Sequence, residues 1–167
     1  MKGYLIDTQT VSYWFAESCP QHANVKAHVM ALDPASQFRV SVVTIGEIEF
    51  GHSFTSAPDL IQQQEFRNFI RETFHAPLEI SRFTPICYGE IRTLLFKKYP
   101  PKSPKHRRPE QCFDPITATE LGIDENDLWI ASQAYEHGLV LVTNDRMTRI
   151  RDVAGHLLDV ENWTDPI

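Results

Sequence analysis

The sequence lacks the residue patterns that mark several common classes of protein. Its three cysteines, Cys19, Cys87 and Cys112, are far apart and form no CxxC spacing, so neither a disulfide framework nor a thiolate zinc site is indicated. The histidines form no HxH or HExxH spacing, which argues against a histidine metal site. There is no glycine-rich phosphate loop and no GxSxG motif, so the nucleotide-binding and serine-hydrolase interpretations have no support.

Long apolar runs are also missing. The first apolar stretch is interrupted by Asp7, and no later run reaches the length of a signal-peptide core or a membrane span. We therefore expect a cytoplasmic protein that makes no membrane contact. The formal net charge of −6 argues against a generally basic surface, so any nucleic-acid contact requires a local basic patch.

The remaining composition is that of an ordinary globular protein. Hydrophobic residues make up 42% and charged residues 23% of the 167 positions, which indicates a packed core rather than disorder. This length suits one domain spanning residues 1–167. Apolar runs and helical spacing predict strands at 3–7, 38–43 and 139–142, with possible short strands at 77–80 and 157–160. They predict helices at 8–15, 23–32, 59–74, 86–96 and 124–137, one that begins at Thr44, and a short one near Asp145.

The order of these elements indicates the architecture. Strands pass directly into helices several times along the chain, with further helical segments between them. This alternation predicts an α/β fold with a mainly parallel central sheet flanked by helices.

Four acidic residues occupy related positions in this arrangement. Asp7 and Asp145 each follow a predicted strand, at the edge where an open parallel sheet places its ligands. Glu47 and Asp127 each lie three residues after a predicted helix cap, Thr44 and Asp124, so we expect their carboxylates to point back towards the strand ends. Taken singly, each acid is more often a helix cap. Taken together, the four are expected to meet at one sheet edge.

Such a cluster has a chemical consequence. Neighbouring carboxylates raise one another's pKa unless a cation neutralises them. Ligation by oxygen alone suits Mg²⁺ or Mn²⁺, ions that activate water and neutralise charge during phosphodiester cleavage. An alternative, an aspartyl-phosphate phosphatase with Asp7 as nucleophile, lacks the second acid two places on, where Gln9 stands.

Five segments in this order and spacing resemble the PIN-domain nucleases, in particular the VapC-like toxin ribonucleases of bacterial toxin–antitoxin pairs. They are Tyr4-Leu-Ile-Asp-Thr8, Thr44-Ile-Gly-Glu-Ile-Glu-Phe-Gly51, Asn126-Asp-Leu-Trp-Ile-Ala131, Leu141-Val-Thr-Asn-Asp145 and Glu161-Asn-Trp163. The chain departs from the family at Gln9, where the family usually has Asn, and in the longer segment 97–122.

The resemblance implies a single PIN-like domain that cleaves RNA with Mg²⁺ or Mn²⁺. The implied metal-binding and catalytic acids are Asp7, Glu47, Asp127 and Asp145, with Thr8, Thr143 and Asn144 as supporting polar groups. It also implies a small antitoxin that blocks the acidic site and a homodimer formed through the helices. The alternative is a PIN-like module that has lost catalysis and binds RNA or protein, although the presence of all four acids argues against it.

Residues 97–123 form a long connection with five prolines. Its first part is basic and contains no acid, and two interpretations remain open. It is either a clamp for RNA phosphates beside the acidic site or a solvated loop stiffened by proline. The candidate RNA-binding residues are Lys97, Lys98, Lys102, Lys105, Arg107 and Arg108. The three tryptophans, Trp14, Trp129 and Trp163, are expected to pack in or near the core.

Overall fold

The computed structural model describes residues 2–74, 76–103, 105, 108–144 and 147–167. Within these residues four strands form one sheet in the order β2-β1-β3-β4, and every neighbouring pair is parallel. This sheet confirms the predicted α/β class. The strands are β1 (Gly3–Ile6), β2 (Gln37–Val40), β3 (Val140–Val142) and β4 (Val160–Glu161).

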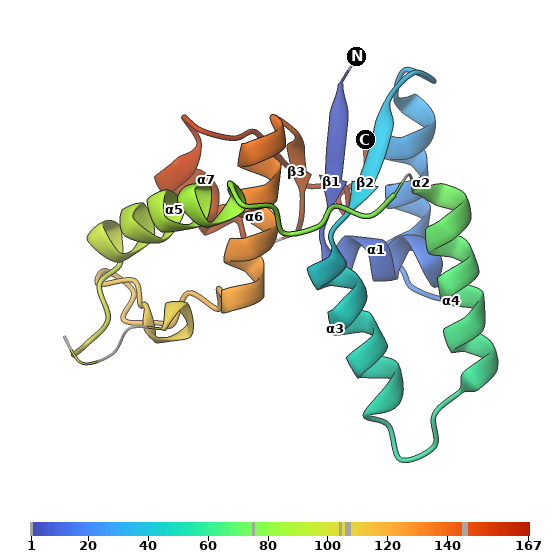
Figure 1. Ribbon diagram of the computed structural model, residues 1–167, viewed down its shortest axis with the longest axis horizontal. Helices are drawn as coiled ribbons and strands as arrows, with labels where there is room; N and C mark the ends of the chain where they lie inside the picture. The colour runs from blue at the N-terminus through green and yellow to red at the C-terminus, as the bar shows by residue number, and fades with distance from the viewer. Residues whose placement is uncertain (1, 75, 104, 106–107, 145–146) are drawn as a thin grey trace.

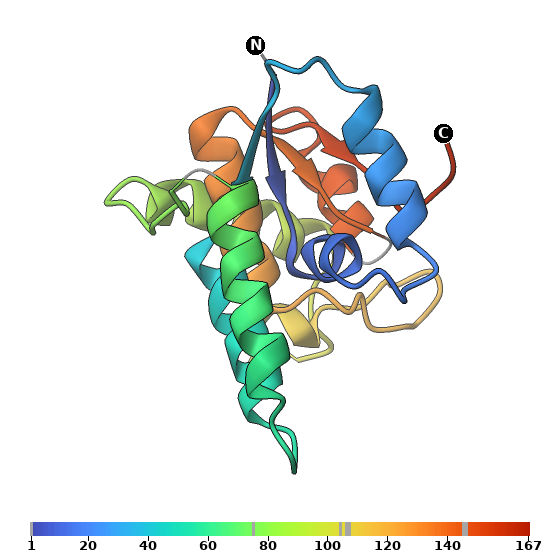
Figure 2. The same cartoon turned by 90° about the vertical axis from the view of Figure 1, so that its right-hand side faces the viewer.

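Helices cover both faces of the sheet (Figure 1). On one side lie α5 (Thr84–Lys98), α6 (Glu125–His137) and α7 (Thr148–Ala154). On the other lie α1 (Thr8–Phe15), α2 (His22–Ala31) and α4 (Leu60–Thr73). Together with α4, helix α3 (Val42–Ser53) forms a hairpin that projects away from the sheet, as Figure 2 shows.

Each face of the sheet has its own hydrophobic core. Leu5 and Leu141 pack with α5, α6 and α7 on one side. Tyr4 and Ile6 pack on the other side with α1, α2 and α4, where Trp163 is 1% exposed. Because side chains alternate between the faces of a strand, β1 is buried on both sides. This explains why its sequence is a continuous apolar run.

Helix α3 begins earlier than the sequence predicted. Ser41 is its N-cap: the backbone there is extended, and the hydroxyl accepts a hydrogen bond from the Val43 backbone N–H at 2.9 Å. The prediction that Thr44 starts the helix is therefore wrong, as is the prediction that strand β2 continues to residue 43. Since one serine both follows the strand and caps the helix, the transition takes a single residue.

Other boundaries also differ. In the predicted strand at 77–80, only Leu78 pairs, through a single parallel bridge to Ser41. Helix α5 extends two residues further at each end than predicted. At its start, Pro85 lies in the first turn, where proline is tolerated. Lys97 and Lys98 therefore belong to α5 and not to the loop. Helix α7 begins at Thr148, and residues 145–146, near which the sequence placed its start, lie outside the described residues.

The long connection from α5 to α6 has some local structure. It contains a short 3₁₀ helix, η1 (Pro109–Gln111), and antiparallel bridges join Pro101 to Cys112 and Phe113 to Glu120. Asp114 accepts a hydrogen bond from Arg149 of α7 at 2.9 Å, which ties the segment to the domain. All three cysteines are free, as predicted. In the part of the chain that the structure describes, no helix is long and apolar enough to cross a bilayer.

Candidate active site

The carboxyl ends of β1 and β3 bring Asp7 and Thr143 together. The Asp7 backbone N–H donates to the carbonyl oxygen of Val142 at 2.9 Å, so the two strands end side by side. The Thr143 hydroxyl then donates to Asp7 Oδ2 at 2.5 Å, and the Thr10 backbone N–H donates to Asp7 Oδ1 at 2.7 Å. Asp7 is thus the N-cap of α1, and the residue is only 5% exposed to solvent.

Asp127 reaches the same region from the first turn of α6. Asp124 caps this helix by accepting the Asp127 backbone N–H at 2.9 Å, and Asp127 Oδ2 accepts the Asp124 backbone N–H at 3.0 Å. The predicted capping box is therefore confirmed. Its reciprocal hydrogen bonds fix the Asp127 side chain against its own helix.

Glu47 comes from α3 and is held in a different way. Because the helix starts at Val42, Glu47 lies in the second turn and not in the first turn that the sequence predicted. The Thr8 hydroxyl donates to Glu47 Oε2, and Asn126 Nδ2 donates to Glu47 Oε1 at 2.9 Å. These donors are side chains from two other helices, so tertiary contacts bring Glu47 to the site.

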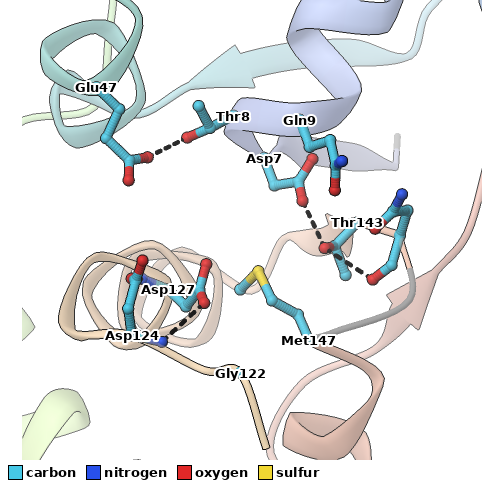
Figure 3. Close-up of a pocket in the computed structure, with 10 residues that line it drawn as sticks. Asp7, Thr8, Gln9, Glu47, Gly122, Asp124, Asp127, Thr143 and Met147 are labelled. Carbon is cyan, nitrogen blue, oxygen red and sulfur yellow. Dashed lines mark hydrogen bonds between the residues drawn. The ribbon is translucent and has the colours of Figure 1, made fainter. Parts of the chain in front are cut away.

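These side chains surround a cavity of about 320 Å³ (Figure 3). Three of the four predicted acids line it, and Asp145 lies outside the described residues. The predicted supporting groups Thr8, Thr143 and Asn144 line it as well. Four lining residues were not among the predicted site residues, namely Gln9, Gly122, Asp124 and Met147.

Burial makes negative charge unfavourable in this cavity. Loss of contact with water raises the pKa of Asp7 well above its usual range, although hydrogen bonds from Thr10 and Thr143 oppose this. Burial also raises the pKa of Asp127 to about 7, and the nearby charges of Asp124, Asp7 and Glu47 add to the effect. The acids therefore influence one another electrostatically, as the sequence predicted.

The oxygen atoms that line the cavity are of the types that bind a hard divalent cation. Within the described ranges, no three Asp, Glu, His or Cys side chains form a ready-made metal-binding group. The lining residues offer carboxylate, hydroxyl and amide oxygens, the ligand types that Mg²⁺ and Mn²⁺ prefer. The raised pKa values of Asp7 and Asp127 also mean that a cation would relieve an existing electrostatic cost. The residues thus fit such an ion.

None of the predicted RNA-binding residues in the described ranges lines the cavity. Lys98 Nζ instead donates to the Asp152 carbonyl oxygen at 3.0 Å, and Lys102 Nζ lies 5.2 Å from the centre of the Phe113 ring. Lys97, Lys105 and Arg108 are exposed, and Arg107 lies outside the described residues.

No role for Asn126 was predicted from the sequence. Nothing in a local pattern pairs this residue with Glu47, which is 79 positions away in the chain. Asn126 is one of several polar residues that occur in first helical turns. The neighbouring Asp127 was detectable because its capping box is local.

Comparison with known proteins identifies the family. A PIN-domain family model matches residues 4–155. A search of curated protein sequences gave no match. The chain is similar in structure to VapBC2 from Rickettsia felis bound to a promoter DNA fragment, with a TM-score of 0.68, 22% identity, and coverage of 96% of this chain and 98% of that one.

Two further solved structures have the same fold. VapBC-1 from nontypeable Haemophilus influenzae gives a TM-score of 0.64 at 22% identity, covering 98% of this chain and 99% of that one. VapBC-5 from Mycobacterium tuberculosis, a member of the VapBC family of toxin-antitoxin systems, gives 0.58 at 18% identity, covering 97% and 98%. The family match and the four-stranded parallel sheet agree with the resemblance seen in the sequence. The chain belongs to the PIN-domain family.

Proposed function

We propose that this chain is a Mg²⁺- or Mn²⁺-dependent endoribonuclease and the toxin of a toxin–antitoxin pair. One observation carries the proposal: Asp7, Glu47 and Asp127, from three different helices or helix caps, line one cavity at the carboxyl ends of the strands. Ligand sites of open parallel sheets lie at this edge. Acids whose pKa is raised by burial are a frequent feature of functional sites.

The residues that would hold the ion are Asp7, Glu47, Asp127 and Asp145. When bound, Mg²⁺ or Mn²⁺ supplies a Lewis acid and positive charge for the hydrolysis of a phosphodiester. Thr143 holds Asp7 in place by donating to its Oδ2 atom, and the capping box holds Asp127. Since no lysine or arginine is among the described residues that line the cavity, an RNA phosphate would be repelled there unless a cation were present.

The basic segment would provide the remaining contacts to RNA. In the proposal, Lys97, Lys98, Lys102, Lys105, Arg107 and Arg108 contact phosphates outside the cavity. Phosphate contacts position a nucleic-acid backbone without reading its sequence. This arrangement accounts for a locally basic segment in a chain whose net charge is −6.

Two features support an antitoxin as the partner. The VapBC-5 structure, which this chain resembles, belongs to a family of toxin-antitoxin systems. The far end of the α3–α4 hairpin carries four large apolar side chains that are each more than 60% exposed: Phe50, Phe54, Leu60 and Ile61. Exposed apolar patches of this kind mark surfaces that bind other proteins. The proposal also includes a homodimer and a cytoplasmic location.

The test is cleavage of a mixed RNA pool by the purified protein with Mg²⁺, Mn²⁺ or EDTA. We expect cleavage only with metal, products with a 5′-phosphate and a 3′-hydroxyl, and a loss of about 100-fold or more in Asp7→Asn. Asp59→Asn is the matched control. Asp59 also caps a helix, α4, but does not line the cavity.

Three results would contradict the proposal. Cleavage that persists in EDTA, or that is equal in Asp7→Asn and Asp59→Asn, would remove the acids from catalysis. RNA binding without cleavage under every metal condition would favour the alternative, a binding module that is catalytically silent.

A further inference from the structure

Of the four acids predicted to bind the metal, the three that the structure describes, Asp7, Glu47 and Asp127, are held by two kinds of contact. Asp7 and Asp127 each accept a backbone N–H from their own helix or its cap, at 2.7 Å from Thr10 and at 3.0 Å from Asp124, and Asp7 accepts the Thr143 hydroxyl as well. The donors found for Glu47 are the side chains of Thr8 and Asn126, which lie on α1 and α6. The position of the Glu47 carboxylate therefore depends on contacts between helices.

Asn126 lies next to Asp127 but faces another direction. Successive residues of an α-helix are rotated by about 100°, so the two side chains of this turn diverge. Asp127 lines the cavity, whereas Asn126 is absent from the cavity lining and donates to Glu47 Oε1 at 2.9 Å. The first turn of α6 thus supplies one acid directly and holds a second acid through Asn126.

Thr8 provides the opposite anchor. It follows Asp7 directly, and its hydroxyl lies 3.3 Å from the Thr44 hydroxyl of α3 as well as donating to Glu47 Oε2. One carboxylate oxygen of Glu47 is therefore bound to Thr8, next to Asp7 on α1. The other is bound to Asn126, next to Asp127 on α6. The α3–α4 hairpin projects from the domain (Figure 2), and these two contacts connect its helix α3 to α1 and to α6.

We infer that Asn126 is a positioning residue, which fixes Glu47 relative to Asp7 and Asp127 through its amide. This inference rests on the proposed function, because it assigns Asn126 to the support of the same metal-binding acids. Asn126 does not itself line the cavity, so the inferred role is to hold Glu47 and not to bind the ion. Loss of a hydrogen bond that orients a metal ligand typically weakens metal affinity or activity by about 10–100-fold.

The experiment measures Mn²⁺ affinity by isothermal titration calorimetry and RNA cleavage on the full chain. We expect Asn126→Ala to raise the Kd for Mn²⁺ and to lower kcat, each by about 10–100-fold, with KM for RNA unchanged. Asn126→Gln keeps an amide donor on a longer side chain and should recover part of both losses. The control is Asn68→Ala, because Asn68 is a helical asparagine whose hydrogen bonds, with Gln64 and Arg71, stay within α4. It should behave as wild type.

A second measurement separates positioning from a general effect on folding. If Asn126 acts through Glu47, then Asn126→Ala should lower Mn²⁺ affinity in the wild type but not in a Glu47→Ala background. Urea midpoints of the metal-free variants should show the same lack of additivity. Additive losses in both measurements would overturn the inference.

The outcomes also distinguish this inference from the proposed function. A wild type that binds Mn²⁺ and cleaves RNA, together with an Asn126→Ala variant that does both equally well, overturns the positioning role alone. A wild type that binds no Mn²⁺ and cleaves no RNA overturns the proposed function and the positioning role together.

Discussion

The two ends of strand β1 have opposite effects on stability. At its start, Tyr4 packs against Trp163 with ring centres 5.1 Å apart, inside a cluster of buried aromatic residues. Just past its end, Asp7 is a buried acid whose pKa is raised by loss of solvation. Burial of aromatic surface stabilises the fold, whereas burial of carboxylates opposes it. A strand of four residues thus connects a stabilising cluster to a site that lowers stability.

The largest effect is expected in the aromatic cluster. Trp163→Ala should lower the free energy of unfolding by ~3–5 kcal/mol, because it removes a fully buried ring and leaves a cavity. The ring packs against Tyr4, Phe38 and His28, and its N–H donates to Glu161 at 2.9 Å. Urea denaturation measures the loss.

Trp129→Ala is the control for that substitution. Trp129 stacks on Tyr88 with ring centres 4.2 Å apart but is only partly buried, so its removal should have a smaller effect. Equal losses in the free energy of unfolding of the two variants would show that the buried aromatic cluster contributes no more to stability than the partly buried Trp129–Tyr88 pair. At a temperature where Trp163→Ala remains folded, it should keep its RNA cleavage, since the ring is not among the residues that line the cavity.

In the acidic cavity, a substitution should increase stability. The pKa of Asp127 is about 7 in the folded protein, compared with 3.8 for an ordinary Asp. Between these values the folded state binds more protons than the unfolded state, so stability falls as pH rises from about 4 to 7. Because each pH unit corresponds to ~1.4 kcal/mol, the full destabilisation above pH 7 is up to ~4 kcal/mol. Asp127→Asn should remove this destabilisation from the metal-free protein.

The measurement is the urea midpoint of metal-free wild type and Asp127→Asn between pH 4 and 8. The variant should gain most at pH 8, and almost nothing near pH 4. Saturating Mn²⁺ should stabilise the wild type at pH 8 and the variant much less. Asp59→Asn, outside the cavity, should keep the pH dependence of the wild type. A stability difference between wild type and Asp127→Asn that does not change with pH would contradict the assignment of the cost to the Asp127 charge.

The two regions also differ in how well the sequence predicted them. Asp7 was predictable because an apolar run that ends in an acid is a local pattern, and Asp127 because its capping box spans four residues. The side of the sheet on which Trp163 packs was not predictable, because its partners Tyr4 and Phe38 are far away in the sequence. The link from Asn126 to Glu47 is of the same long-range kind.

Glu47 shows how a correct residue can come with a wrong local explanation. The sequence identified it as a cavity acid, but through Thr44 as a helix cap, whereas Ser41 caps α3. Both residues are hydroxyl-bearing and follow apolar positions, so either fits the cap preference. The choice depends on where β2 ends, and this is fixed by Leu78, whose backbone N–H donates to the Val40 carbonyl oxygen at 2.9 Å.

The smallest expected effect tests this cap. Ser41→Ala removes the hydroxyl that accepts the Val43 N–H and should lower the free energy of unfolding by ~1 kcal/mol. Thr44 lies inside α3, and Thr44→Val should have less effect. The hydroxyl near Thr44 is that of Thr8, which keeps its hydrogen bond to Glu47 when the Thr44 hydroxyl is removed. A larger loss from Thr44→Val would mean that α3 begins at Thr44. Glu47 would then lie in the first turn, as the sequence predicted, although its donors Thr8 and Asn126 would still belong to α1 and α6.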